Sequence, residues 1–412
     1  MKLLIINIQQ LVNVRKESKV LRGKELAELP IVENAYLIIE NGLISEYGLM
    51  KDLSIDLHTT KVFDADGQFV LPTWCDSHTH LVFAKSRENE FVDKIKGFSY
   101  QEIAARGGGI LNSAKAVQES SEESLFNDAW KRLHELIQLG TGAIEIKSGY
   151  GLTTDTELKM LRVIRRLKEK SPIPVRSTFL GAHTFPAAFV NDHQGYMDLI
   201  IHEMLPMIAK ENLADYIDVF CEEGFFSIDE TTTICNAGIK YGLQPKIHAN
   251  QFSSGGVTVG VNVNAISVDH LETMDDNEIK ILSESNTIGT LLPTAAFFLR
   301  MPFQPARKLV EAGCTVALAS DYNPGTSPSG NMNLVVSMSC IQMKMLPEEA
   351  INAATINGAY AMGLGNIAGS ITVGKNANLI FTKPIPSLAY LAYAFGTDLI
   401  DKVMINGNFI NK

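Results

Sequence analysis

The residues best suited to chemistry are two histidines, His78 and His80, which follow a short apolar run ending at Cys75. In an extended segment, residues two positions apart point to the same side, so both imidazoles can aim at one point. Imidazole nitrogen binds zinc and iron, and a catalytic site needs a few such ligands with one position left for water. A single His-x-His pair is weak evidence, because the same spacing also occurs among buried histidines that simply form hydrogen bonds.

Three further polar residues follow predicted strands elsewhere in the chain. His248 follows residues 244–247, His270 follows 265–268, and Asp321 follows 315–319. Barrel enzymes carry their sites at the C-terminal ends of their strands. We therefore expect these side chains to meet the two histidines at one rim and form a metal site, rather than to be unrelated buried polar groups.

A closed parallel barrel is the arrangement that would bring these side chains together. Between residues 69 and 319, short apolar strands alternate with amphipathic helical stretches, as is typical of repeated βα units. We expect eight strands, at residues 69–75, 141–146, 175–180, 216–221, 244–247, 265–268, 287–292 and 315–319. The predicted fold is therefore α/β, a (β/α)8 TIM barrel.

The two chain ends predict a second, smaller domain. The first 69 residues are short β-type segments with turns such as Asn41-Gly42, and β-type pieces return at 377–382 and 402–405, after a predicted helix at 347–362. Because the chain ends in the same kind of strands with which it begins, we expect them to pair. The predicted division is a small β-sandwich-like domain from residues 1–69 and 366–412, and a barrel from residues 70–365.

Composition limits the class of partner. The 412 residues are 46% hydrophobic, which is enough for a large core, and the net charge of −10 is spread over 46 acidic and 36 basic residues. This balance disfavours nucleic acid and anionic membranes and favours a small-molecule substrate. No stretch approaches the about 18 apolar residues of a membrane span. The five cysteines form no CxxC pair, so we expect reduced thiols in the cytoplasm and, from the frequency of such assemblies, a homodimer.

The placement of histidines after strands one, five and six, and of an aspartate after strand eight, resembles the amidohydrolase superfamily over nearly the whole chain. A closer resemblance is to the imidazolonepropionase family, and it rests on residues 145–151 (EIKSGYG), 179–183 (FLGAH) and 320–328 (SDYNPGTSP). That family implies hydrolysis of the cyclic amide of 4-imidazolone-5-propanoate to N-formimino-L-glutamate, in histidine degradation. The alternatives are another amidohydrolase, acting on a cyclic amide or deaminating an aminated heterocycle, and a catalytically dead barrel, which would lack some of the metal ligands.

The resemblance also implies roles for individual residues. One metal ion, zinc or iron, would be held by His78, His80, His248 and Asp321. Substrate contacts would come from Arg87, Tyr150, His183, Gln251, Asn323, Gly325 and Thr326. Some superfamily members hold two ions bridged by a carboxylated lysine, for which Lys147 is the candidate. It lies near strand two rather than strand four, so we expect a single ion and a structural Lys147.

Gln251 stands where related deaminases, and some members of the closer family, carry a glutamate that acts as acid and base. Glutamine cannot take up a proton at neutral pH, so it can only orient the substrate. Proton transfer is then expected to fall to His270 and Asp321. Asp321 would accept the proton of a metal-activated water, whose pKa falls from about 15.7 toward about 7, and His270 would orient this water and stabilise the oxyanion.

The remaining predicted contacts concern the ring and the acid tail of the substrate. His183 is expected to bind the ring or to steady the oxyanion, and Tyr150 to cap the ring. The propionate needs cationic or N–H donors, which Arg87 and the 323–326 loop are expected to supply.

Overall fold

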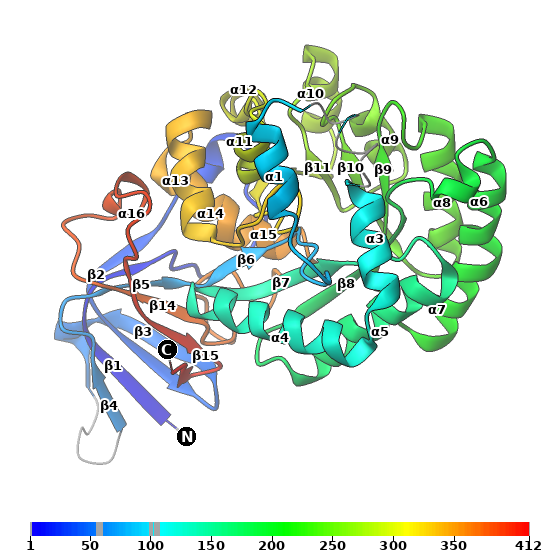
Figure 1. Ribbon diagram of the computed structural model, residues 1–412. Coiled ribbons are helices and arrows are strands. Elements are labelled where there is room, and N and C mark those ends of the chain that lie inside the picture. Colours follow the sequence, from blue (N-terminus) through cyan, green and yellow to red (C-terminus); the bar gives the residue numbers. More distant parts are fainter. Residues whose placement is uncertain (1, 55–60, 99–101, 103–107, 412) are drawn as a thin grey trace.

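The computed structural model describes residues 2–54, 61–98, 102 and 108–411. Eight parallel strands form one sheet in chain order, from β6 to β13. Their bounds are β6 Trp74–Asp76, β7 Thr141–Lys147, β8 Val175–Ala182, β9 Tyr216–Cys221, β10 Gln244–Ala249, β11 Ser267–His270, β12 Ile288–Leu291 and β13 Val316–Leu318. This nearly closed, helix-covered sheet is the predicted TIM barrel (Figure 1).

The segments that follow the first and last strands bring the two edges of the barrel together. Thr79 and Tyr322 form a parallel bridge just beyond β6 and β13. Asp321 donates its N–H to the carbonyl of His78 (3.0 Å), and His80 donates to the carbonyl of Tyr322 (2.8 Å). The chain that carries the candidate metal ligands therefore also closes the barrel.

Helices cover the outside of the barrel, and most follow a strand. In α4 the side chain of Ser121 accepts the N–H of Ser124 as an N-cap, and a buried stripe that includes Leu125, Ala129 and Leu136 faces the core. The helices are α1 Glu88–Ile95, α3 Ile110–Glu119, α4 Glu122–Gln138, α5 Thr154–Lys170, α6 His193–Leu199, α7 Leu205–Glu211, α8 Ile228–Lys240, α9 Gly256–Asn262, α10 Asp276–Ser283, α11 Pro293–Leu299, α12 Ala306–Glu311, α13 Met332–Met343, α14 Pro347–Asn352, α15 Gly358–Tyr360 and α16 Tyr390–Tyr393. No helix in the described part of the chain has the length and apolar character needed to cross a membrane.

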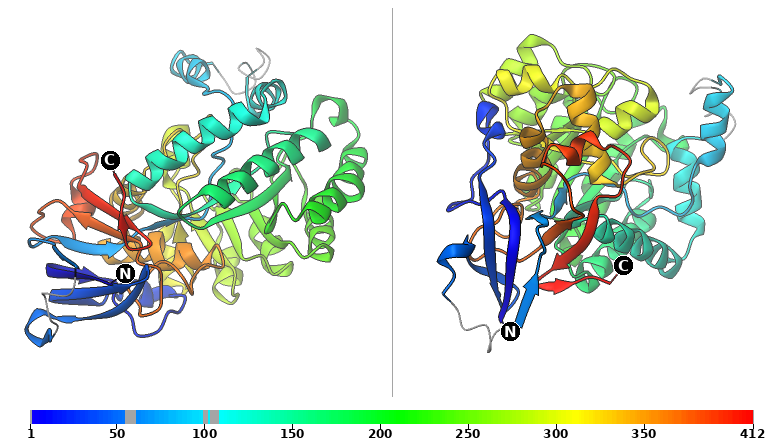
Figure 2. Two further views of the ribbon diagram at one scale, coloured as in Figure 1. Left: turned by 90° about the horizontal axis from the view of Figure 1, so that it is seen from below. Right: turned by 90° about the vertical axis from the view of Figure 1, so that its left-hand side faces the viewer.

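Strands from both chain ends form the second sheet, as expected, and both termini lie on this side of the molecule (Figures 1 and 2). The strand order is β16-β15-β14-β5-β1-β2-β3, with β4 paired to β1. The bounds are β1 Lys2–Val12, β2 Ile31–Glu40, β3 Leu43–Leu49, β4 Lys61–Asp64, β5 Phe69–Pro72, β14 Leu379–Thr382, β15 Ile400–Ile405 and β16 Asn408–Phe409. The sheet has its own apolar core, which includes Ile5, Leu37 and Phe381.

One predicted strand is divided between the two sheets. Instead of a single strand over 69–75, β5 pairs with β1 and β14 in the small sheet, and β6 begins the barrel. At the crossover, Thr73 donates its N–H to Asn378 and Trp74 donates to Gly140. A continuous apolar run shows that a segment is buried but cannot show that its hydrogen-bonding partners change halfway.

Candidate metal centre and catalytic site

Three histidines and an aspartate meet at the C-terminal rim of the barrel. His78, His80 and His248 are buried and offer nitrogens within 4.8 Å of one another. The Nε2 atoms of His80 and His248 are 3.4 Å apart, and Asp321 Oδ1 lies 3.5 Å from Nε2 of both His78 and His80. The family resemblance implies these four residues as one ligand set, and the fold brings them together.

The donor set fits a metal ion by size and by chemistry. Four ligand atoms about 2.1 Å from a tetrahedral ion lie about 3.4 Å from one another, which matches the observed separations. His78 Nε2 is buried and has no hydrogen-bond partner in the described part of the chain, which is costly unless a ligand occupies it. Three imidazoles and one carboxylate suit zinc and iron alike.

Two buried carboxylates lie beside the Nδ1 atoms of His78 and His248. Asp269 Oδ2 lies 2.7 Å from His78 Nδ1, and Asp218 Oδ2 lies 3.0 Å from His248 Nδ1. The Asp269 carboxylate can only accept a hydrogen bond here, so His78 Nδ1 carries the proton and His78 Nε2 offers its lone pair to the centre of the site. Burial lowers the pKa of both histidines well below its usual value, which keeps them in this neutral, ligating form.

Lys147 lies beneath the histidines in a cluster of buried charges. Its Nζ is 2.6 Å from Glu145, 2.8 Å from Asp218 and 3.6 Å from Asp269, while Lys246 forms an ion pair with the other oxygen of Glu145. Burial disfavours the charged amine, but the carboxylates more than offset this and raise the pKa of Lys147 above its usual value. Because carboxylation requires a neutral amine, an ammonium at this position is not the form that could become a bridging carbamate.

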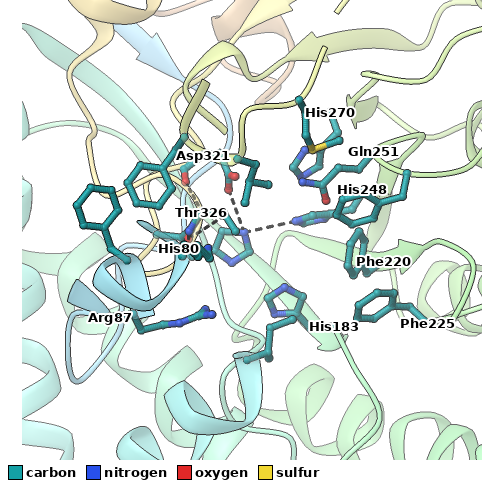
Figure 3. A pocket seen from close by; sticks show the side chains of 18 of the residues that line it. His80, Arg87, His183, Phe220, Phe225, His248, Gln251, His270, Asp321 and Thr326 are labelled. Carbon is teal, nitrogen blue, oxygen red and sulfur yellow. Dashed lines mark hydrogen bonds and ion pairs between the residues drawn. The ribbon is translucent and has the colours of Figure 1, made fainter. Parts of the chain in front are cut away.

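His270 ends β11 with an unusual backbone conformation and lines the same cavity (Figure 3). Its φ is +93°, a region that non-glycine residues rarely occupy and that is often found at functional sites. Its Nδ1 lies 3.5 Å from Glu272 Oε1, which also accepts the amide of Gln304 at 3.0 Å. Burial would lower the pKa of His270, but the Glu272 carboxylate outweighs burial and raises it to about 9.

Asp321 faces the cavity from the turn after β13. Its φ is +52°, so its backbone is also strained. Burial raises the pKa of its carboxyl to about 7, although the positive charge of His270 opposes the shift. A buried carboxylate with this pKa can both accept and release a proton near neutral pH.

The cavity has a volume of about 630 Å³ and is lined by both polar and aromatic side chains. In Figure 3, His270 and Gln251 lie on one side, whereas Arg87 extends into the space from another. Phe220, Phe225 and Phe252 line the cavity beside them. Such a space suits a small cyclic molecule that is held at a few polar points.

His183 and Tyr150 are positioned by the loop after β7. His183 Nδ1 lies 3.0 Å from the carbonyl of Gly149, which only accepts, so Nδ1 carries the proton and Nε2 is an acceptor. The buried Glu157 accepts the N–H groups of Gly149, Gly151 and Leu152 and so fixes the loop around Tyr150. A neutral acceptor can bind a ring N–H but cannot stabilise an oxyanion. Of the two roles expected for His183, this geometry therefore favours binding the ring.

Burial lowers the pKa of His183 to about 4, against about 6.5 for an unperturbed histidine, so its contribution to stability depends on pH. As the pH falls below 6.5 the unfolded chain binds this proton first, so stability is lost between pH 6.5 and 4, by up to about 3 kcal/mol. We expect His183→Gln to remove this part of the acid dependence. Urea unfolding at pH 7 and pH 5 measures it, with the exposed His134→Gln as control; equal pH dependence in both variants would contradict the assignment.

The three predicted loop residues form a tight turn around one side chain. Asn323 Oδ1 accepts the N–H groups of Gly325 (2.8 Å) and Thr326 (2.7 Å), and the Asn323 amide donates to the carbonyl of Asp321 (2.7 Å). These N–H groups were expected to grip the acid tail, but Asn323 already satisfies them. A Cβ at residue 325 would lie 2.0 Å from Arg87 Nη1, so glycine there lets the guanidinium pack against the turn.

Gln251 is held by its backbone rather than by its side chain. Its N–H donates to Glu222 Oε1 (2.5 Å), and the other oxygen of Glu222 accepts from Ser253. Glu222 therefore anchors the loop that follows β10 and leaves the Gln251 amide at the cavity wall. Glu222, Asp218, Asp269 and Glu272 support the site but were not predicted from the sequence.

Comparison with known proteins agrees with this architecture. Residues 230–410 match the amidohydrolase family model. The imidazolonepropionase of Christiangramia forsetii is 56% identical over 412 residues, covering 100% of both chains, and that of Flavobacterium johnsoniae is 56% identical over 409 residues, covering 99% of both. Among solved structures, guanine deaminase from C. acetobutylicum has a TM-score of 0.72 at 16% identity and covers 100% of both chains, so it supports the fold alone.

Proposed function

The chain belongs to the imidazolonepropionase family of amidohydrolases, and we propose that it hydrolyses the cyclic amide of 4-imidazolone-5-propanoate to N-formimino-L-glutamate. It is an enzyme, a hydrolase acting on a C–N bond. The observation that carries the proposal is the meeting of three histidines, Asp321 and His270 at one rim of the barrel, in a chain 56% identical to named relatives along its whole length.

We propose that His78, His80, His248 and Asp321 hold a single ion, zinc or iron. Their spacing supports the ligand set, and the ammonium form of Lys147 supports a single ion without a bridging carbamate. When bound, such an ion supplies a Lewis acid for the ring carbonyl and makes water a stronger acid at neutral pH.

In this proposal Asp321 accepts and returns the proton, and His270 stabilises the oxyanion. Asp321 accepts a proton as water adds to the ring carbonyl, because its pKa of about 7 lets the carboxylate act as a base near neutrality. His270, with a pKa of about 9, is protonated on both nitrogens and donates a hydrogen bond to the developing oxyanion. Asp321 then returns its proton to the ring nitrogen, the C–N bond breaks, and the carboxylate and formimino products form.

The other cavity residues bind and orient the substrate. We propose that His183 Nε2 accepts a ring N–H, that the Gln251 amide hydrogen-bonds the ring, and that Tyr150 covers it. Arg87 holds the propionate, with Thr326 at the same wall. In this assignment Asn323 and Gly325 shape the turn on which Arg87 rests.

The direct test is the loss of ultraviolet absorbance of freshly prepared imidazolone propanoate with purified protein. We expect loss that stops when the metal is removed by a chelator and returns when zinc or iron is restored. Cytosine and guanine serve as controls, because Gln251 lacks the proton-carrying carboxyl of deaminases and should give no ammonia. Turnover of these bases without turnover of the imidazolone would favour the alternative amidohydrolase activity.

We also propose a cytoplasmic homodimer without nucleic acid or membrane partners. All five cysteines are free thiols, which suits a reducing compartment. Light scattering of the purified protein at several concentrations measures the oligomeric state, and a monomeric mass throughout would refute the dimer.

A further inference from the structure

Arg87, at the cavity wall, already has a carboxylate partner. Glu90 Oε2 accepts Arg87 Nε (2.8 Å) and Nη2 (2.6 Å), and both side chains are nearly buried. Glu90 Oε1 accepts the N–H of Gly109 and the amide of Asn112, so the carboxylate is fixed from both sides. Glu90 therefore locks the guanidinium in place but also neutralises its charge.

A neutral ion pair is a poor receptor for an anionic tail. Adding a substrate carboxylate to Arg87 and Glu90 alone would give the group a net charge of −1 within a partly dry cavity, where an uncompensated charge is costly. A second cation beside Arg87 would make the bound group neutral. The geometry of α1 supplies one, because Lys94 follows Glu90 by one helical turn and faces the same space.

Lys94 converges with Arg87 on one residue of the opposite loop. Arg87 Nη1 packs directly against Gly325, and Lys94 Nζ lies 3.4 Å from the Gly325 carbonyl, a long hydrogen bond. The ammonium also lies over the Phe298 ring, 5.6 Å from its centre, and both side chains line the cavity. Burial lowers the pKa of Lys94, and the charge of Arg87 lowers it further, so the ammonium gains from an added anion.

We propose that Lys94 is a second cation for the substrate carboxylate, and that the receptor is the group Arg87, Glu90 and Lys94 rather than Arg87 alone. The guanidinium of Arg87, which Glu90 holds in place, orients the substrate carboxylate, and Lys94 supplies the net positive charge. The chemical class recognised is a flexible monocarboxylate tail on a small ring. The assignment rests on the proposed function only for the identity of that ring.

The test compares Lys94→Met with wild type on imidazolone propanoate and on its neutral propanamide analogue. We expect KM for the acid to rise by about 10- to 100-fold, the loss of a charged hydrogen bond, with kcat changed by less than about twofold. The kcat/KM for the amide should be unchanged, because the amide carries no charge for Lys94 to meet. Lys94→Arg should recover most of the affinity.

The matched control is Lys96→Met, which removes the same charge from the same helix end at an exposed residue outside the cavity. Equal rises in KM for the two variants, or an equal loss with the amide analogue, would overturn the assignment. Calorimetric binding of imidazole-4-propanoate needs no turnover and separates the two proposals. If the wild type did not turn over the imidazolone but bound imidazole-4-propanoate more tightly than Lys94→Met does, the proposed reaction would be refuted and the role of Lys94 retained. If the wild type neither turned over the imidazolone nor bound imidazole-4-propanoate, both proposals would be refuted.

Discussion

Replacing Asp321 by asparagine is expected to lower kcat by about 10³-fold or more, because one carboxylate serves two purposes in the proposed reaction. The amide cannot accept the proton of the attacking water, and it is a neutral, weaker ligand than the anion that lies 3.5 Å from His78 and His80. The backbone bond from residue 321 to the His78 carbonyl is kept, so the barrel should stay closed. Single-turnover kinetics and metal content of the purified variant measure the two losses.

Asp76 provides a matched control for this variant. It is equally buried, burial raises its pKa to about 7 as well, and it accepts bonds from the N–H (3.0 Å) and hydroxyl (2.6 Å) of Ser320. It does not line the cavity. Asp76→Asn should therefore lower stability by about 1–3 kcal/mol while retaining metal and most of kcat. If Asp321→Asn kept kcat within about tenfold of wild type, Asp321 would not be the proton acceptor.

The rim at which the candidate metal ligands meet could be predicted from the sequence, because their position depends on strand ends alone. His248 and His270 each stand at the end of an apolar run, and parallel strands in a barrel place all such ends at one rim. For the first strand, the His-x-His spacing indicated that both imidazoles point to the same rim. The fold and the meeting of these side chains at one rim followed from this rule, whereas the choice of four ligands among them came from the family resemblance. The wrong bound for the first strand, which divides at Thr73, affected neither.

The charged residues that contact the candidate ligand histidines could not be paired from the sequence, because no local pattern shows which side chains meet. Asp218, Lys246 and Asp269 lie inside apolar strands, and a charged residue in a buried strand was a signal that could have been used. Which carboxylate meets which histidine is decided by the register between neighbouring strands. Lys94 is a harder case, because its helix comes near Gly325 only through the folding of a loop that carries no periodic signal.

His270→Gln is expected to lower kcat by about 10²- to 10³-fold, the usual effect of losing one preorganised oxyanion donor. The backbone at this residue is held at φ +93°, and the ring is directed by Glu272, which lies between it and Gln304. A glutamine amide can fill the space, but it carries no positive charge to stabilise the oxyanion. The steady-state rate with saturating substrate measures the loss.

Metal content distinguishes His270→Gln from Asp321→Asn. The cluster able to hold an ion consists of His78, His80 and His248, so the His270 variant should retain its metal, whereas the Asp321 variant should bind it more weakly. A His270→Gln protein that lost its ion would place His270 among the ligands instead. A variant that kept both its ion and its rate would show that His270 is not the oxyanion donor of the proposed reaction.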